Sequence, residues 1–396
     1  MKKTVGMMTS EESFLNNYGA ALQGYALQRT IRGLGYEPKI IRYNGYGPKR
    51  RFGWIKDIIK KVLRVKKGQL TKEQKDRLEY LKSVSEAHKD EIEKRTVCFQ
   101  TFQDETMQFY SSERMTWEKL KKNPPQFDIY VCGSDQIWNP VFHGGICDRG
   151  YFLDFAPADR KRIAYAPSLG TDYLPETCKN EMKMLIDKMC AVAVREEKGA
   201  ELLTDLMGRR IDTVLDPTLL LSKEEWLEVA RVPENIPEKY ILCYRFSDNP
   251  ETLSAVKELS HRTGLPVVSL PLSPIAMEDP FMNIYEVGPR EFIGLISKAS
   301  LVCTDSFHAT VFSFLMNTPF LTFMREQYSD GTASMNSRVV NLLKSVDLTS
   351  RIVAKLQDVN MDTLFDNDYS SGKQTILSNK KRSIDYLKEA LEREIC

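Results

Sequence analysis

The stretch that decides the fold is TVGMMTSEESFLNNYGAALQGYALQRTIRGLGYEPKIIRY, residues 4–43. The apolar run at residues 4–8 predicts a short buried strand, and the polar loop after it leads into a helix. A second strand over residues 39–43 completes a β-α-β unit, which predicts a parallel sheet. Along the helix, apolar and small residues recur at helical spacing and Gly35 stands where a C-cap is expected: Ala20, Gly24, Leu27, Ile31 and Leu34.

Strand and helix patterns continue to alternate along the chain, in two series. The first includes RIAYAPSLG at residues 162–170, and the second includes CAVAVREEKGAELL at residues 190–203 and EKYILCYRF at residues 238–246. We therefore predict an α/β protein with two doubly wound, Rossmann-like lobes, whose ligands bind at the carboxyl ends of the strands and between the lobes. We expect a first lobe at residues 1–174, which contains a charged helical insertion at residues 49–123. A second lobe is expected at residues 175–375 and a docked C-terminal helix at residues 376–396.

Composition excludes several classes of protein. The chain has 396 residues, of which 42% are hydrophobic and 28% charged, with a net charge of +2, as in a soluble globular protein that is no general nucleic-acid binder. No apolar run approaches the ~20 residues of a membrane span, so a cytoplasmic location is expected. The eight cysteines form no C-x-x-C pair and only four histidines are present, so we expect reduced thiols, no metal site and no cofactor.

The segment CTDSFHATVF, residues 303–312, is the most informative for chemistry. An apolar strand runs into Asp305, Ser306 and His308 and then into an apolar helix, so His308 is expected at a helix N-terminus, which favours anions. There a histidine can donate or accept a proton near neutral pH. The alternative is that Asp305 and Ser306 only cap the helix and His308 packs in its first turn.

Three further segments carry candidate binding residues. Arg195 follows the buried strand of AVAVREEKG, where it can hold a carboxylate or phosphate in a bidentate fork or simply pair with a neighbouring glutamate. The segments VCGSDQIWN and NNYGAALQ combine hydroxyl, carboxylate and amide groups with an aromatic ring, which suits a sugar but also suits a capped helix with a core aromatic. Their candidate sugar-binding residues are Asn16, Asn17, Tyr18, Ser134, Asp135, Gln136 and Trp138.

Several pieces of the sequence, in order, resemble the polysaccharide pyruvyl transferase family. They lie between about residues 4 and 345, skip the charged insertion, and include NYGAALQGYAL, YVCGSDQIWN, AYAPSLG, VREEKG, VLDPTLLL, the stretch around CTDSFHATVF and an R-x2-N-L-L run at Arg338. The resemblance implies a fold similar to the two-lobed GT-B glycosyltransferases. It also implies phosphoenolpyruvate (PEP) as donor and a ketal across two hydroxyls of a surface sugar or its precursor as product.

Carried over by position, Arg195 resembles the family's donor-binding arginine and His308 its catalytic histidine. Asp305 is expected to cap the helix and orient the imidazole. This chain departs from the family's Arg-Leu-His motif, because Ser306-Phe307-His308 stands there and one donor-binding arginine is missing. Ser306 is retained as a donor-side residue, and the arginines that can replace the missing one are Arg245, Arg325 and Arg338.

Two alternative functions remain open at this stage. One is a nucleotide-sugar-dependent glycosyltransferase of the same fold, although no Gly-rich nucleotide motif supports it. The other is a non-catalytic sugar-binding scaffold, which the missing arginine favours.

Residues 49–67 form a possible membrane contact. Their apolar residues recur at helical spacing among lysines and arginines, with Trp54 just ahead, as in a basic amphipathic helix at an anionic membrane surface. Such a helix would bring the enzyme to a lipid-linked acceptor at the inner face of the membrane. The alternative is an inserted helix that buries its apolar face on its own lobe.

Overall fold

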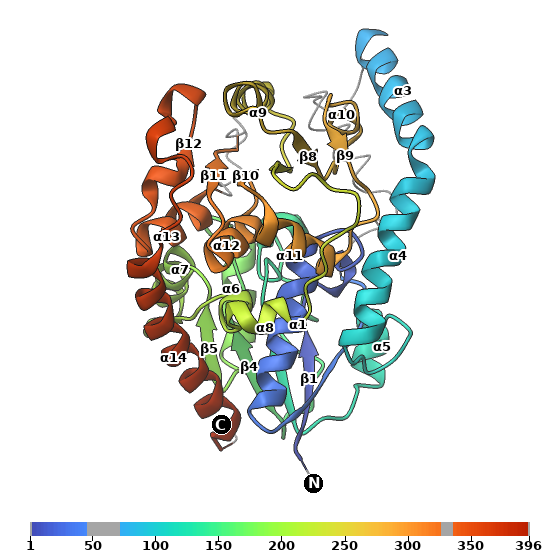
Figure 1. Cartoon of the computed structure of the whole chain (residues 1–396). Coiled ribbons are helices and arrows are strands. Elements are labelled where there is room, and N and C mark those ends of the chain that lie inside the picture. Colours follow the sequence, from blue (N-terminus) through green and yellow to red (C-terminus); the bar gives the residue numbers. More distant parts are fainter. Residues whose placement is uncertain (1, 46–71, 326–335, 395–396) are drawn as a thin grey trace.

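The computed structural model describes residues 2–45, 72–325 and 336–394, which contain two parallel β-sheets (Figure 1). The first sheet has the strand order β2-β1-β3-β4-β5-β6, and each pair of neighbours is parallel. Its strands are β1 Thr4–Met8, β2 Glu37–Ile40, β3 Ile129–Cys132, β4 Lys161–Tyr165, β5 Ala191–Val194 and β6 Asp212–Thr213. The β-α-β opening is confirmed, because helix α1 (Tyr18–Gly33) connects β1 to β2.

The second sheet has the order β12-β11-β10-β7-β8-β9 and is also parallel. Its central strands are apolar and fully buried, since helices cover both faces of a doubly wound sheet. The predicted α/β class with two Rossmann-like lobes is confirmed. The strands are β7 Ile241–Tyr244, β8 Val267–Ser269, β9 Met282–Asn283, β10 Leu301–Thr304, β11 Phe320–Phe323 and β12 Ile352–Val353. Helices of these two series are α6 Glu176–Ile186, α7 Glu197–Met207, α8 Lys223–Leu227, α9 Pro250–Thr263, α10 Pro274–Met277, α11 Pro289–Lys298, α12 Phe307–Met316 and α13 Ser337–Ser345.

The expected change of lobe near residue 175 is wrong. Strand β5 pairs with β4, and β6 pairs with β5, so both belong to the first sheet. Helix α6, where the change was expected, is a crossover that returns the chain to the same sheet. The chain enters the second sheet only at β7, after Thr213. Arg195, which directly follows β5, therefore belongs to the first lobe and not to the second.

Helix α1 packs against both lobes and gives them a common core. All of its residues from 18 to 28 are buried. The Tyr18 ring stacks on Phe292 of α11, with 4.5 Å between ring centroids, and its hydroxyl donates to the Val287 carbonyl at 3.0 Å. One hydrophobic cluster runs from β1 through α1 to α12. The two lobes are thus joined by packed side chains, not only by a connecting segment.

The described part of the charged insertion is helical, as predicted, and it bridges the lobes. It consists of α3 (Lys72–Ala87), α4 (Lys89–Thr106) and α5 (Trp117–Lys122). Figure 1 shows α3 and α4 running along one side of both lobes, where α3 contacts α10 and α4 contacts α11. The basic segment at residues 49–67 lies outside the described residues.

Arg95 of α4 holds the insertion to the second lobe. Its guanidinium is buried and donates to the backbone carbonyls of three residues, Pro271 at 2.6 Å, Ile284 at 3.3 Å and Tyr285 at 3.4 Å. Arg95→Ala leaves these acceptors without a donor, which typically costs about 1–3 kcal/mol. We expect a lower free energy of unfolding in a denaturant titration. Lys94→Ala is the matched control, because it removes only an exposed ion pair with Glu286; equal effects of the two variants would refute the bridging role.

The C-terminal helix α14 (Ser370–Glu392) docks on the first lobe, although it follows the second in the chain (Figure 1). The Ser383 hydroxyl accepts from the Leu215 backbone N at 3.0 Å, and Lys161 donates to the Leu391 carbonyl at 2.7 Å. Its apolar pattern predicted a start at residue 376, but the helix begins earlier, at Ser370. None of the helices in the described ranges is both long and apolar enough to cross a membrane.

Candidate active site

His308 lies in the first turn of α12, directly after strand β10. The Ser306 side-chain oxygen caps this helix by accepting a hydrogen bond from the Ala309 backbone N at 3.3 Å. His308 is only 7% exposed, and its Nε2 has no hydrogen-bond partner within the described residues. The predicted strand–loop–helix arrangement is confirmed. The Ser306 oxygen accepts the capping hydrogen bond and its O–H can still donate, so its contact with the donor stays a prediction.

Asp305 does not cap the helix, contrary to expectation. Its carboxylate oxygens accept from the backbone N of Phe246 at 2.7 Å and of Ser247 at 2.8 Å, and Oδ2 lies 3.5 Å from Arg325 Nε. The carboxylate points back toward the end of β7 because Asp305 stands one residue before the N-cap position. Its bonds lead away from the imidazole, so Asp305 ties two strand ends together instead of orienting His308.

Arg195 lies at the end of β5, with a side chain only 3% exposed. Nη1 donates to Asp216 Oδ2 at 2.7 Å and Nε donates to Glu196 Oε1 at 3.0 Å. Burial alone would lower the pKa of Arg195, but the carboxylates of Glu196 and Asp216 outweigh it and raise the pKa. The guanidinium is therefore a fixed positive charge, and its Nη2 has no hydrogen-bond partner among the described residues.

Asp216 connects Arg195 of the first lobe to His308 of the second. Its fully buried Oδ2, 2.7 Å from Arg195 Nη1, is also 3.6 Å from His308 Nε2. Oδ1 accepts from the Thr218 backbone N at 3.0 Å and from the Thr218 hydroxyl at 2.7 Å. Burial would raise the pKa of Asp216, but His308 and Arg195 reverse the effect and hold it well below the usual range. The structure thus brings His308 and Arg195 together, as expected.

Sequence reasoning missed Asp216. Its segment, VLDPTLLL, is part of the family resemblance, but an aspartate before a proline also reads as an ordinary turn residue. Asp216 indeed caps a short 3-10 helix, Pro217–Leu219, through Thr218. One carboxylate oxygen serves that local role and the other faces the two candidate catalytic residues.

Gly19, in the first turn of α1, lets His308 approach the helix closely. A Cβ atom on Gly19 would lie 2.0 Å from His308 Nδ1. The glycine in NYGAALQ therefore leaves the space that the His308 imidazole of the other lobe occupies.

Gly19→Ala should push the imidazole away from Asp216. We expect a loss of turnover of at least about 10-fold, since small misplacements of reacting groups are costly, and a loss of stability of about 1–3 kcal/mol from overpacking. Gly33→Ala at the other end of α1 is the control, because nothing lies within 4 Å of its added Cβ. Steady-state kinetics and thermal unfolding of both variants check this. Full activity of Gly19→Ala would show that the His308 position is not critical.

The loop after β3 reaches the same cluster. The Ser134 hydroxyl donates to the Ala166 carbonyl at 2.9 Å and lies 3.3 Å from Asp216 Oδ2. Asp135 Oδ1 is 3.9 Å from Arg195 Nη1. With its amide oxygen turned toward Arg338, Gln136 accepts from Nη2 at 2.7 Å and from Nη1 at 3.0 Å. Ser134, Asp135 and Gln136 therefore adjoin the candidate active site.

The aromatic residues expected to bind sugar are core residues. Tyr18 is buried between the lobes, and Trp138 is 1% exposed, stacks on Phe152 with 4.6 Å between centroids and donates to the Tyr151 carbonyl. Asn17 caps α1 through Ala20, whereas Asn16 is exposed. The sugar-binding expectation for Tyr18 and Trp138 is wrong, because the faces of both rings are covered by protein.

Two of the three replacement arginines already have carboxylate partners. Arg245 donates to Asp279 Oδ2 at 2.6 Å, and its side chain is 4% exposed. Arg325 lies against Asp305 and donates to its carbonyl at 3.0 Å. These bonds give both arginines a structural role, so neither is favoured as the donor-binding arginine.

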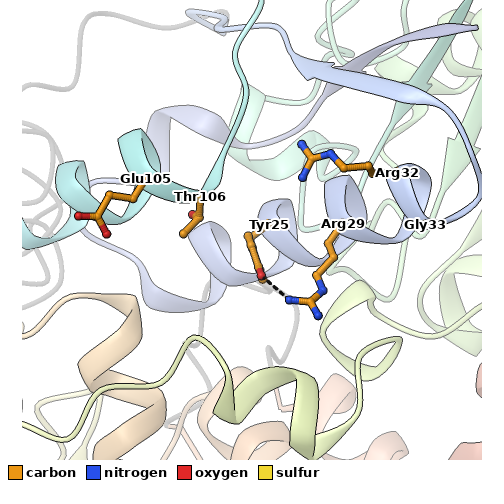
Figure 2. A pocket seen from close by; sticks show the side chains of 6 residues that line it. All are labelled: Tyr25, Arg29, Arg32, Gly33, Glu105 and Thr106. Atoms are coloured by element: carbon orange, nitrogen blue, oxygen red, sulfur yellow. Dashed lines mark hydrogen bonds between the residues drawn. The ribbon is translucent and has the colours of Figure 1, made fainter. Parts of the chain in front are cut away.

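A surface groove of about 490 Å³ lies elsewhere, at the C-terminal half of α1 and the end of α4 (Figure 2). Its lining residues are Tyr25, Arg29, Arg32, Gly33, Glu105 and Thr106. Arg29 already pairs with Glu228 at 2.8 Å, and Glu105 with Arg290 at 2.8 Å. None of the candidate catalytic residues lines this groove, so its size does not make it the active site.

Two Rossmann-like lobes with a buried Arg–Asp–His cluster where they meet define a GT-B-like protein. The sequence model for "Polysaccharide pyruvyl transferase" matches residues 17–327. The chain belongs to the polysaccharide pyruvyl transferase family, as the sequence motifs indicated.

Comparison with solved structures finds distant likenesses. The UDP-GlcNAc 2-epimerase of Methanocaldococcus jannaschii, in complex with UDP-GlcNAc and UDP, is 14% identical with a TM-score of 0.48, over 98% of this chain and 99% of that one. The UDP-GlcNAc 2-epimerase of Neisseria meningitidis bound to UDP-GlcNAc is 12% identical with a TM-score of 0.47, over 99% and 100%. The glycosyltransferase SnogD of Streptomyces nogalater is 10% identical with a TM-score of 0.44, over 99% and 98%. No curated protein matches the chain in sequence.

Proposed function

We propose that this protein transfers the pyruvyl group of PEP to two hydroxyls of a sugar in a surface polysaccharide or its precursor, forming a ketal. The observation that carries the proposal is the buried contact of Arg195 and His308 with one oxygen of Asp216, in a chain of the pyruvyl transferase family. The cluster combines a fixed cation, a proton donor and a carboxylate that orients both. Anion binding and proton transfer are the two tasks that PEP chemistry requires.

In this proposal an anionic group of PEP binds near Arg195, and the imidazolium of His308 donates a proton to the methylene carbon. The adjacent carbon becomes an oxocarbenium-like centre, which a sugar hydroxyl attacks while its proton passes to the imidazole. The bond from that carbon to the phosphate oxygen then breaks, and inorganic phosphate leaves with the electron pair. A second hydroxyl adds to the same carbon, passes its proton to the departing phosphate and closes the ketal.

The Asp216 carboxylate lies 3.6 Å from His308 Nε2, where it orients the imidazole toward the bound donor. The rate enhancement comes from position and electrostatics inside a buried site. On the acceptor side we propose Asn16, Asp135 and Gln136, since the aromatic candidates are buried in the core. A lipid-linked acceptor is the proposed form in which the sugar arrives.

Phosphate release tests this function against its alternatives. The protein is incubated with PEP, alone and with free or lipid-linked galactosides, glucosides and mannosides, and in a parallel arm with UDP-sugars. We expect inorganic phosphate from PEP only when an acceptor is present. Turnover of a UDP-sugar without PEP consumption would favour a glycosyltransferase, and sugar binding without turnover of either donor would favour a scaffold.

A further inference from the structure

The Arg195–Asp216–His308 cluster contains a buried hydrogen-bond donor without a partner. Within the described residues, Arg195 Nη2 is shielded from solvent and makes no hydrogen bond. Leaving a buried polar group unpaired typically costs about 1–3 kcal/mol. Such groups in a native protein call for an explanation, and a bound ligand that accepts hydrogen bonds is one.

Arg338 of α13 adds a second guanidinium to this cluster. It is 9% exposed and lies on the same aromatic ring as Arg195, since the Phe307 centroid is 4.9 Å from Arg195 Cζ and 5.8 Å from Arg338 Cζ. Burial and the charge of Arg195 lower the pKa of Arg338 to about 10. Its hydrogen-bond partner is Gln136, a neutral amide, and the carboxylates of Glu196 and Asp135 offset the lowering of its pKa only in part.

The position of Arg338 also distinguishes it from the other arginines of the second lobe. Arg245 is neutralised by Asp279 and Arg325 is held by Asp305. Gln136 accepts from two of the five N–H groups of Arg338 and brings no charge of its own. A planar guanidinium of this kind binds an oxyanion in bidentate geometry.

We propose that Arg338, together with Arg195 Nη2, forms an oxyanion site that replaces the arginine missing at Ser306. The inference rests on the proposed function for its natural ligand, which is a phosphate or carboxylate group of PEP. In this proposal the second donor-binding arginine is provided by α13 instead of the start of α12. The Phe307 ring lies beside both guanidinium groups.

Calorimetric titration with inorganic phosphate, pyruvate and PEP tests the site without any turnover. We expect wild-type protein to bind PEP and at least one of the two fragments, and the fragment that binds identifies the group held by Arg338. Arg338→Met should weaken that binding at least 10-fold. Arg262→Met is the control and should stay within about two-fold of wild type, because Arg262 forms only a surface ion pair with Glu258 on α9.

Gln136→Glu keeps the proposal testable if Arg338→Met does not fold. The new carboxylate would sit where the Gln136 oxygen meets both Nη atoms and would act as an internal anion. We expect weaker phosphate or pyruvate binding with an unchanged or higher melting temperature.

Wild-type ligand affinity in both Arg338→Met and Gln136→Glu, or an equal loss in Arg262→Met, would overturn the inference, as would the absence of any anion binding. Anion binding through Arg338 without pyruvyl transfer would instead refute only the proposed function. Conversely, pyruvyl transfer with an unchanged KM for PEP in Arg338→Met would refute only this site.

Discussion

His308→Gln is expected to lower kcat by about 10²–10⁴-fold, the usual contribution of a general acid–base residue. Glutamine remains polar in the space beside Asp216 but cannot transfer a proton. His308 makes no hydrogen bond through Nε2 within the described residues but lies 3.6 Å from Asp216 Oδ2, so the variant should fold with an only modestly lower melting temperature. The measurements are phosphate release at saturating PEP and thermal unfolding of the same preparation.

The control for His308→Gln is His261→Gln, in the last turn of α9, away from the cluster. It should keep wild-type turnover. A folded His308→Gln protein with full activity would assign His308 a packing role against Gly19 and remove it from the chemistry.

Asp216→Asn should reduce turnover by at least about 10²-fold, since Asp216 positions both other members of the cluster. The amide can still accept the two Thr218 hydrogen bonds on one oxygen, so the local turn is preserved. The charge that faces Arg195 and His308 is lost. Asp212→Asn is a suitable control, because Asp212 pairs with Arg210 at the surface. Equal turnover of the two variants would contradict the positioning role.

Stability against pH gives a second measurement on Asp216. Its folded-state pKa is depressed, so its stabilising contribution is complete above the unfolded value of about 3.9 and is lost as the pH falls toward the folded value. The difference in unfolding free energy between wild type and Asp216→Asn should therefore be constant above about pH 5 and shrink below about pH 4. A difference that does not change with pH would mean that the carboxylate charge does not stabilise the fold.

The fold was predictable wherever local patterns are strong. Apolar runs such as Thr4–Met8 and the strand before His308 identify buried parallel strands, and the spacing along α1 identifies its helix. The lobe boundary was not predictable, because β5 looks the same whether it joins the first sheet or the second. Only its pairing with β4 decides the matter, and β6 is a two-residue edge strand with little sequence signal.

The candidate site was predictable in part, for a related reason. Residues that end buried strands, such as Arg195 and His308, are brought together by the topology of parallel sheets. An aromatic residue next to polar groups is ambiguous, because Trp138 stacks on Phe152 as readily as on a sugar. Likewise the sequence does not show which arginine lacks a carboxylate, since the partners of Arg245 and Arg325 lie 34 and 20 residues away.

Transfer of an isotope label from PEP to a sugar tests the central claim most directly. Protein, labelled PEP and a panel of glycosides are incubated, and the products are analysed by mass spectrometry. We predict an acceptor whose mass has increased by pyruvic acid less one water, with one inorganic phosphate released per label transferred and no such product with His308→Gln. A label that stays in PEP with every acceptor, while the protein transfers sugar from a nucleotide sugar, would contradict the account.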